Sequence, residues 1–165
     1  MILKIETGRD NPTLRKKSEV VSAVTKKTVK LIKDMAETMA HADGVGLAAP
    51  QIGVNLRIVL ITLAGKKILP MINPKITSMS EKTSVAEEGC LSLPNEWGKV
   101  RRSDEITVEF QGIKGERITA KFKGMEAREA QHEIDHLDGV LFTDYLEDGH
   151  VLFNDLVGES EIEMV

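Results

Sequence analysis

The chain contains a single cysteine, Cys90, among its 165 residues, which excludes an internal disulfide bond. A lone thiol fits a reducing compartment, so we expect the cytoplasm, or an organelle matrix if the chain is a mature form. Long hydrophobic runs are also absent, and charges interrupt the apolar N-terminus, which argues against a membrane span and a signal peptide. Without repeats or low-complexity linkers, a chain of this length is expected to form one domain, 1–165.

The sequence also lacks a strong excess of one charge. Its 22 Lys and Arg residues nearly balance its 26 Asp and Glu residues, and the net charge is -4. This balance offers no electrostatic case for binding nucleic acid or a membrane, so we expect neither partner. The acids are concentrated at 147–165, where six of them occur without any Lys or Arg, and we interpret this segment as an acidic C-terminal tail.

What the chain does contain is the segment His132-Glu133-Ile134-Asp135-His136. On a helix, residues four apart lie on one face, so both imidazoles can reach one metal ion. Glu133 leans over the same face, where a carboxylate can deprotonate a bound water, as metal-assisted amide hydrolysis requires. The alternative is a chance pair of surface histidines on an amphipathic helix, which ordinary composition makes rare.

The flanking sequence favours a helix around this segment. An apolar stripe recurs at helical spacing and consists of Ala127, Ala130, Ile134 and Leu137. A second face carries Glu129 together with the two histidines and Glu133. Gly124 is placed to act as the N-cap, and Asp138-Gly139 is placed to end the helix.

A catalytic metal site of this kind takes three protein ligands and leaves one position open. The long metalloprotease pattern would put its third histidine at Phe142, and glutamates further downstream fall in the acidic tail. The remaining candidates are Cys90, His41, His150 and scattered acids. His41 follows a helix predicted at 25–40 and is favoured as a solvated end residue. The missing ligand therefore favours Cys90, which could otherwise be a core residue or a reactive thiol.

Two β-hairpins are predicted from apolar runs and alternation. Their strands are 56–63 with 67–72, and 106–110 with 118–122. The Gly- and Ala-rich stretch 43–53 is a weak signal alone, because a tight connection explains it equally well. Its functional interpretation is a backbone along which a peptide can lie, with the amide of Gln51 as a hydrogen-bond donor.

Three segments together resemble the signature motifs of peptide deformylases. They are Gly44-Val45-Gly46-Leu47-Ala48-Ala49-Pro50-Gln51, Glu88-Gly89-Cys90-Leu91-Ser92 and Gln131-His132-Glu133-Ile134-Asp135-His136. The resemblance runs from about residue 2 to residue 146 and implies an α+β catalytic domain, with antiparallel β-sheets packed around a central helix that carries the metal ligands. It also implies removal of the formyl group from N-terminal formyl-methionine, so formyl-methionyl peptides and nascent chains are the expected substrates.

The resemblance assigns Cys90, His132 and His136 as metal ligands and Glu133 as the general base. Two imidazoles and a thiolate suit zinc on coordination grounds. The family is known as ferrous-dependent, however, with nickel, cobalt or zinc able to replace the iron. We therefore expect one divalent ion, Fe²⁺ in the cell.

The same resemblance implies an oxyanion site and a substrate-binding edge. The side-chain amide of Gln51 and the backbone N–H of Leu91 would hold the formyl oxygen as charge develops on it. Val45, Gly46 and Gly89 would pair with the substrate backbone as an added strand. A further expectation is that Arg102 pairs with Glu88 and supports the site without taking part in the chemistry.

Two features depart from the family pattern. Ribosome-associated members carry a basic C-terminal helix, so the acidic tail argues against ribosome docking through this segment. Glu129 stands where family members usually carry an apolar residue that lines the methionine pocket. Either its side chain turns outward at the pocket rim and changes little, or it makes the pocket more polar and less selective for methionine.

Two other functions remain as alternatives. A small metallopeptidase is disfavoured by the missing third histidine. A non-catalytic relative that binds peptides or senses metal is disfavoured because the residues of all three motifs are intact. Formate release from a formyl-peptide distinguishes the three functions.

Overall fold

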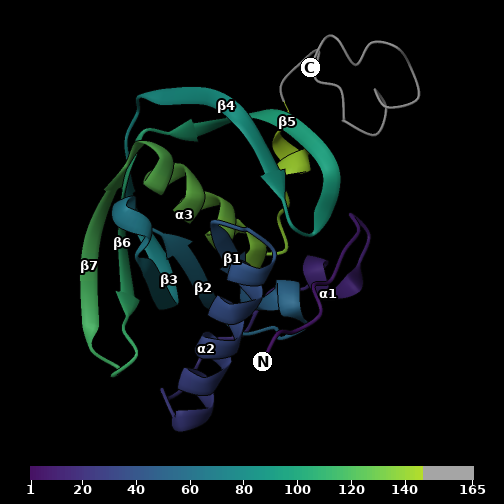
Figure 1. The fold of residues 1–165 in the computed structure, drawn as a ribbon. Helices are drawn as coiled ribbons and strands as arrows, with labels where there is room; N and C mark the ends of the chain where they lie inside the picture. The colour runs from purple at the N-terminus through teal and green to yellow at the C-terminus, as the bar shows by residue number, and fades with distance from the viewer. Residues whose placement is uncertain (147–165) are drawn as a thin grey trace.

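The computed structural model describes residues 1–146, and the acidic tail at 147–165 lies outside the described residues. Within 1–146, a central helix, α3 (Gly124–Leu137), is surrounded by two antiparallel sheets (Figure 1). This α+β arrangement confirms the predicted fold class. None of the helices in these residues is both long and apolar enough to cross a membrane.

The larger sheet has five strands in the order β1-β2-β3-β6-β7, and every neighbouring pair is antiparallel. The strands are β1 (Gly46–Ala48), β2 (Ile58–Thr62), β3 (Ile68–Met79), β6 (Glu105–Gln111) and β7 (Arg117–Lys123). The β2–β3 and β6–β7 pairs confirm both predicted hairpins. Strand β1 is an edge strand of this sheet, and it carries the Gly- and Ala-rich motif.

Strands β4 (Thr83–Cys90) and β5 (Leu93–Ser103) form a separate two-stranded sheet that arches over α3 (Figure 1). The sequence analysis did not predict these strands. For β4 the reason is visible in its burial, because Glu88 is its only buried residue. A strand whose buried position is a carboxylate has no apolar alternation to detect.

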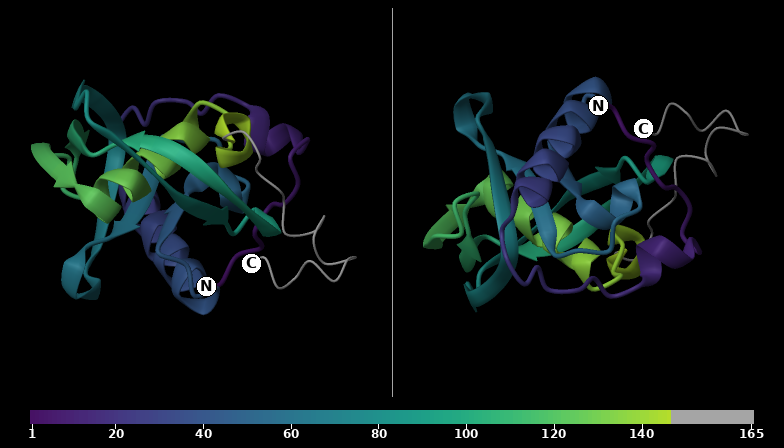
Figure 2. Two further views of the ribbon diagram at one scale, coloured as in Figure 1. Left: turned by 90° about the horizontal axis from the view of Figure 1, so that it is seen from above. Right: turned by 90° about the horizontal axis from the view of Figure 1, so that it is seen from below.

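Helix α2 (Lys26–His41) packs on the face of the large sheet opposite to α3. Alternate residues of β2 point to the two helices: Val59 and Ile61 belong to the core beside α3, whereas Ile58 and Leu60 belong to the core beside α2. Views from above and below show strands of the sheet between the two helices (Figure 2). The helix predicted at 25–40 is confirmed, and His41 is exposed at its end, as expected.

All four residues of the predicted apolar stripe of helix α3 are buried in the core. Its N-terminus differs from the prediction, because Lys123 is the N-cap and makes no side-chain cap bond. Gly124 instead turns the chain from β7 into the helix with φ 57°, a conformation that favours glycine. The predicted end is confirmed, with Asp138 as the C-cap and Gly139 at φ 73°.

A short helix, α1 (Pro12–Arg15), and the chain before it lie against the ends of the motif-bearing segments. The backbone N–H of Glu6 donates to the carbonyl of Gln51 over 2.7 Å, and the N–H of Gly8 donates to the carbonyl of Ser92 over 3.0 Å. The N-terminal segment thereby fixes the Gln51 turn and the end of β4 relative to each other.

Candidate metal centre and active site

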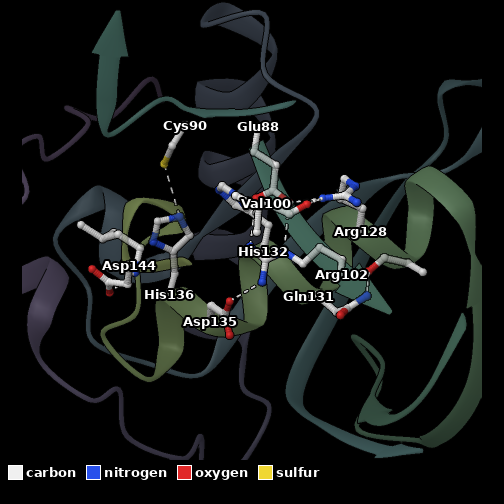
Figure 3. A network of polar contacts seen from close by, with 12 residues as sticks. Glu88, Cys90, Val100, Arg102, Arg128, Gln131, His132, Asp135, His136 and Asp144 are labelled. Atoms are coloured by element: carbon white, nitrogen blue, oxygen red, sulfur yellow. Dashed lines mark hydrogen bonds and ion pairs between the residues drawn. The ribbon is translucent and has the colours of Figure 1, made fainter. Parts of the chain in front are cut away.

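The three predicted ligands come together from two elements. Cys90 is the last residue of β4, while His132 and His136 lie one turn apart on α3 (Figure 3). Their ligand atoms all lie within 4.8 Å of one another, and Cys90 Sγ is 3.4 Å from His136 Nε2. Donors at about 2.0 to 2.3 Å from one tetrahedral ion are roughly 3 to 4 Å apart, so the group fits a metal ion.

Among the described residues, no other ligand candidate joins this group. His41 is exposed at the far end of α2, and His150 lies outside the described residues. Phe142, at the position of a third histidine in the long metalloprotease pattern, is buried and stacks beside His132 with ring centroids 6.2 Å apart. The sequence position that holds a metal ligand in that pattern therefore holds a packed core side chain in this fold.

The chemistry of the Cys90 thiol suits a ligand. Burial alone would raise its pKa, but the neighbouring His136 and His132 outweigh burial and lower the pKa to about 5. A thiolate is the form that binds metal. The side-chain amide of Gln51 adds a donor 3.4 Å from Cys90 Sγ.

His132 is oriented by a buried carboxylate. Its Nδ1 lies 2.9 Å from Glu88 Oε1, which directs Nε2 towards the thiol and the pocket (Figure 3). Arg102 binds the two oxygens of Glu88 through Nε and Nη2, each over 2.9 Å, so the predicted pairing is present. Burial would raise the pKa of Glu88, but Arg102 and His132 hold it far below its usual range.

Arg128 is a second arginine on Glu88, and the sequence analysis did not predict it. Its Nη1 donates to Glu88 Oε2 over 2.7 Å and to the carbonyl of Val100 over 2.9 Å, while Nη2 donates to the carbonyl of Ser84 over 2.8 Å. These bonds tie α3 to both β4 and β5. A charged residue between two apolar helix positions normally indicates solvent exposure, so no sequence signal distinguished Arg128.

Asp135 completes this network from the helix side. Arg102 Nη1 donates to Asp135 Oδ2 over 2.6 Å, and the Arg102 guanidinium lies 5.1 Å from the ring centre of Tyr145. Asp135 is three residues after His132, a spacing that could have indicated a shared face. The network therefore connects the strand that carries Cys90 to the helix that carries both histidines.

Beside these donors lies a cavity of about 380 Å³ between β1, the end of β4 and α3. It is lined by the predicted residues Val45, Gly46, Gln51, Gly89, Cys90, Leu91, Glu129, His132 and Glu133. Trp97 and Met125 also line it and were not predicted; with Val45 they are exposed apolar side chains. The Trp97 ring packs so closely on Gly89 that a Cβ there would stand 2.7 Å from it.

Gln51 holds a defined orientation in this cavity. Its Oε1 accepts from the N–H of Ala48 over 2.9 Å, and its Nε2 donates to Ser92 Oγ over 3.1 Å. The amide nitrogen consequently faces Cys90 and the cavity. Leu91 follows Cys90 directly, so its backbone lies beside the same space.

Glu129 does not turn outward at the rim, which corrects one of the two interpretations above. Its carboxyl group ends beside that of Glu133, because a Cβ built on Gly46 would stand 2.5 Å from Glu129 Oε1 and 2.4 Å from Glu133 Oε2. Burial raises the pKa of both carboxyl groups. Two ionised carboxyl groups this close repel, so the charge of Glu129 raises the pKa of Glu133 further.

Comparisons with known proteins agree with this geometry. The family model for polypeptide deformylase matches residues 2–151. The peptide deformylase of Pseudothermotoga lettingae is 48% identical over 146 residues, which cover 88% of this chain and 84% of that protein. The crystal structure of peptide deformylase from Thermotoga maritima gives a TM-score of 0.85 at 41% identity, over 89% of this chain and 99% of that one.

A peptide deformylase from Synechococcus elongatus, solved in complex with actinonin, gives a TM-score of 0.85 at 36% identity. The match covers 89% of this chain and 80% of that chain. Agreement at this level of sequence and structure, over nearly all the described residues, goes well beyond a shared fold. Since all three motifs meet around one cavity, the chain belongs to the polypeptide deformylase family, enzymes that remove the N-formyl group from newly made peptides.

Proposed function

We propose that Glu133 is the general base of this deformylase and that Cys90, His132 and His136 hold its metal ion. The observation that carries the proposal is the placement of Glu133. Its Oε1 is buried and has no hydrogen-bond partner within residues 1–146, and the side chain lines the cavity beside the three donors. A divalent ion held there would supply a Lewis acid and make water more acidic.

Glu133 moves the proton in this scheme. Its carboxylate takes a proton from the attacking water as the water oxygen bonds to the formyl carbon. When the C–N bond breaks, the same carboxyl group gives that proton to the departing amine, and formate is released. A buried carboxylate with a raised pKa is a stronger base than a solvated one, which suits this role.

Gln51 and Leu91 are proposed to hold the formyl oxygen. The amide of Gln51 is fixed before substrate arrives, because its Oε1 accepts from the N–H of Ala48 and one N–H of its Nε2 donates to Ser92 Oγ. A preorganised donor of this kind is worth roughly 2.7 to 4 kcal/mol where charge develops. The backbone N–H of Leu91 would supply the second donor from the end of β4.

The substrate backbone is proposed to lie between Val45 and Gly46 on one side and Gly89 on the other. Strand β1 is at the edge of its sheet, so the side away from β2 is open to an added strand. Glycine at 46 leaves room for the Glu133 and Glu129 carboxyl groups, and glycine at 89 leaves room for the Trp97 ring, so both strand ends lie close to the side chains that line the cavity. Glu129 would add a polar wall where the first side chain of the substrate enters.

The metal in the cell is proposed to be Fe²⁺, with zinc, nickel or cobalt able to replace it. Two imidazoles and a thiolate can hold each of these ions and suit zinc on coordination grounds, so the proposal of Fe²⁺ rests on the family. Metal analysis of protein purified without oxygen tests this choice. The substrates are proposed to be nascent formyl-methionyl chains in the cytoplasm.

Formate release tests the function directly. We expect formate from formyl-Met-Ala-Ser and no reaction with acetyl-Met-Ala-Ser or free Met-Ala-Ser. Cleavage of internal peptide bonds would instead indicate a metallopeptidase. Substrate binding without formate from metal-loaded protein would indicate a non-catalytic relative.

A further inference from the structure

Strand β5 contains a long bulge beside the substrate pocket. In the register of β4 and β5, Glu88 pairs with Gly98 and Cys90 pairs with Leu93, so four residues of β5, at 94–97, face one residue of β4. All four line the cavity. Bulges redirect side chains and are frequent next to active sites. The β5 bulge, 94–97, therefore forms one wall of the pocket where the regular ladder is interrupted.

An ion pair from the N-terminal segment reaches this bulge. Nε and Nη2 of Arg9 both donate to Glu96 Oε1, over 2.8 and 2.6 Å. The side chain of Glu96 is 13% exposed and that of Arg9 is 40% exposed, so the carboxylate is the partner that is largely removed from water. A charged group in such a position needs a partner of opposite charge close by, which Arg9 supplies.

The backbone of Arg9 is itself held on both sides. The N–H of Gly8 donates to the carbonyl of Ser92 over 3.0 Å, and Nε of Arg15 donates to the carbonyl of Arg9 over 2.6 Å. Arg15 Nη1 in turn donates to the carbonyl of Gly139 over 3.1 Å. The Arg9 guanidinium is therefore presented to the bulge from a fixed backbone.

Neighbouring residues of the β5 bulge face different partners. Asn95 bends the chain with φ 64°, a conformation that Asn adopts more readily than most residues. Glu96 binds Arg9, while the ring of Trp97 packs on Gly89. A displacement of Glu96 would therefore move Trp97 and change the space beside Gly89.

We propose that Arg9 is a positioning residue for peptide binding, because its ion pair with Glu96 holds the β5 bulge, and with it Trp97, as a fixed wall of the pocket. This inference rests on the proposed path of the substrate beside Gly89. Without the pair, the wall would have to be ordered when the peptide binds, and that entropy cost weakens binding. The metal donors and Glu133 would stay in place, so the effect belongs to KM and not to kcat.

Arg9→Gln tests the loss of the pair in metal-loaded protein. We expect KM for formyl-Met-Ala-Ser amide to rise about 3- to 5-fold, which is the size that a partly exposed ion pair supports. The kcat should stay at the wild-type value. The amidated peptide carries no terminal carboxylate, so charge at the pocket edge affects its binding little.

Exchanging the two charges separates the ion pair from the individual side chains. Arg9→Glu places two carboxylates together, and we expect KM to rise about 10-fold because like charges repel. Glu96→Arg alone should raise KM as well. The double variant, Arg9→Glu with Glu96→Arg, restores an ion pair and should return KM to within about 2-fold of wild type.

Lys30→Gln is the matched control. Lys30 Nζ lies 2.9 Å from Asp34 Oδ2, and the Asp34 side chain is 12% exposed, so this variant also takes a cation from a carboxylate that is largely removed from water. The pair lies on α2, and neither residue lines the cavity. We expect wild-type KM and kcat. A KM raised as far as in Arg9→Gln would overturn the proposal, because any broken ion pair would then have the same effect.

Calorimetric binding of the product Met-Ala-Ser amide gives a readout that does not depend on turnover. We expect Kd to rise in Arg9→Gln and Arg9→Glu and to recover in the double variant. Wild-type KM and Kd in Arg9→Glu, no recovery in the double variant, or a loss carried by kcat would each overturn the proposal. If wild type released no formate, the proposed function would fail, while the Kd values still decided this inference.

Discussion

Cys90 and His136 are two of three donors, and no fourth protein donor stands near them among the described residues. We expect Cys90→Ala or His136→Ala to abolish tight binding of one metal ion per chain, because two remaining ligands hold a divalent ion poorly. Metal content after purification and dialysis measures this. His41→Ala removes an exposed histidine and should retain full metal. Full metal content in either ligand variant would mean that the ligand set is wrong.

Glu133 should behave differently from the ligands. Glu133→Ala is expected to keep its metal and lose at least about 10²-fold in kcat, because the carboxylate transfers protons without binding the ion. Formate release by protein of verified metal content measures the loss. Wild-type kcat in such protein would remove Glu133 from the mechanism.

At the same scale, the sequence predicted the group of Cys90, His132 and His136 that the fold brings together, but it predicted only part of the set of residues around that group. Imidazole spacing on a helix and a lone Cys restrict the chemistry strongly. Arg128 and Trp97 carry no such signal, because a charged helix residue or a single aromatic fits many surroundings. Their roles depend on which strands lie above α3, and this tertiary arrangement is not encoded in a local sequence pattern.

Among the elements, the β4–β5 hairpin depends on Glu88 for its attachment to α3. Glu88→Gln leaves Arg102 and Arg128 with less negative charge in a buried site, and we expect a loss of roughly 3 to 5 kcal/mol in the free energy of unfolding near pH 7. Urea unfolding of metal-free protein measures it. Glu87→Gln, on the exposed side of the same strand, should change stability little.

The pH dependence of stability follows from the same residue. The folded-state pKa of Glu88 lies well below an unfolded value of about 4.3, so the folded chain binds fewer protons. Its contribution is therefore full above about pH 5 and is lost as pH falls towards the folded pKa. Wild type should lose stability between about pH 5 and pH 2 more steeply than Glu88→Gln, and parallel curves would contradict this assignment.

The β4–β5 hairpin is also the part of the two sheets that the sequence patterns did not predict. The β2–β3 and β6–β7 hairpins have apolar faces against a core, so alternation identified them. Strand β4 faces a cavity and buries a carboxylate, and its residues 83–90 show no such alternation. Elements that build a site are thus harder to predict than those that build a core.

For the whole molecule, a bound metal would join two parts of the fold, since Cys90 belongs to the small sheet and both histidines belong to α3. At a free metal concentration about 1,000 times Kd, binding stabilises the folded state by roughly 4 kcal/mol. For a domain of this size, that corresponds to a Tm increase of about 8 to 16 °C. Thermal unfolding with and without a chelator measures the shift, and Cys90→Ala should show none. An equal shift in Cys90→Ala would place the stabilising ion elsewhere.

Because Trp97 packs on Gly89 at the pocket, its fluorescence can report what binds there. Trp97 is the only tryptophan of the chain, it is 52% exposed, and Cys90 follows Gly89 directly. Intrinsic fluorescence therefore comes from one indole at the pocket, without background from the rest of the fold. A peptide that enters beside Gly89 would shield the ring and shift its emission to shorter wavelength. A coloured ion such as Co²⁺ at Cys90 would quench it by energy transfer, so peptide and metal binding could be followed separately on unlabelled protein.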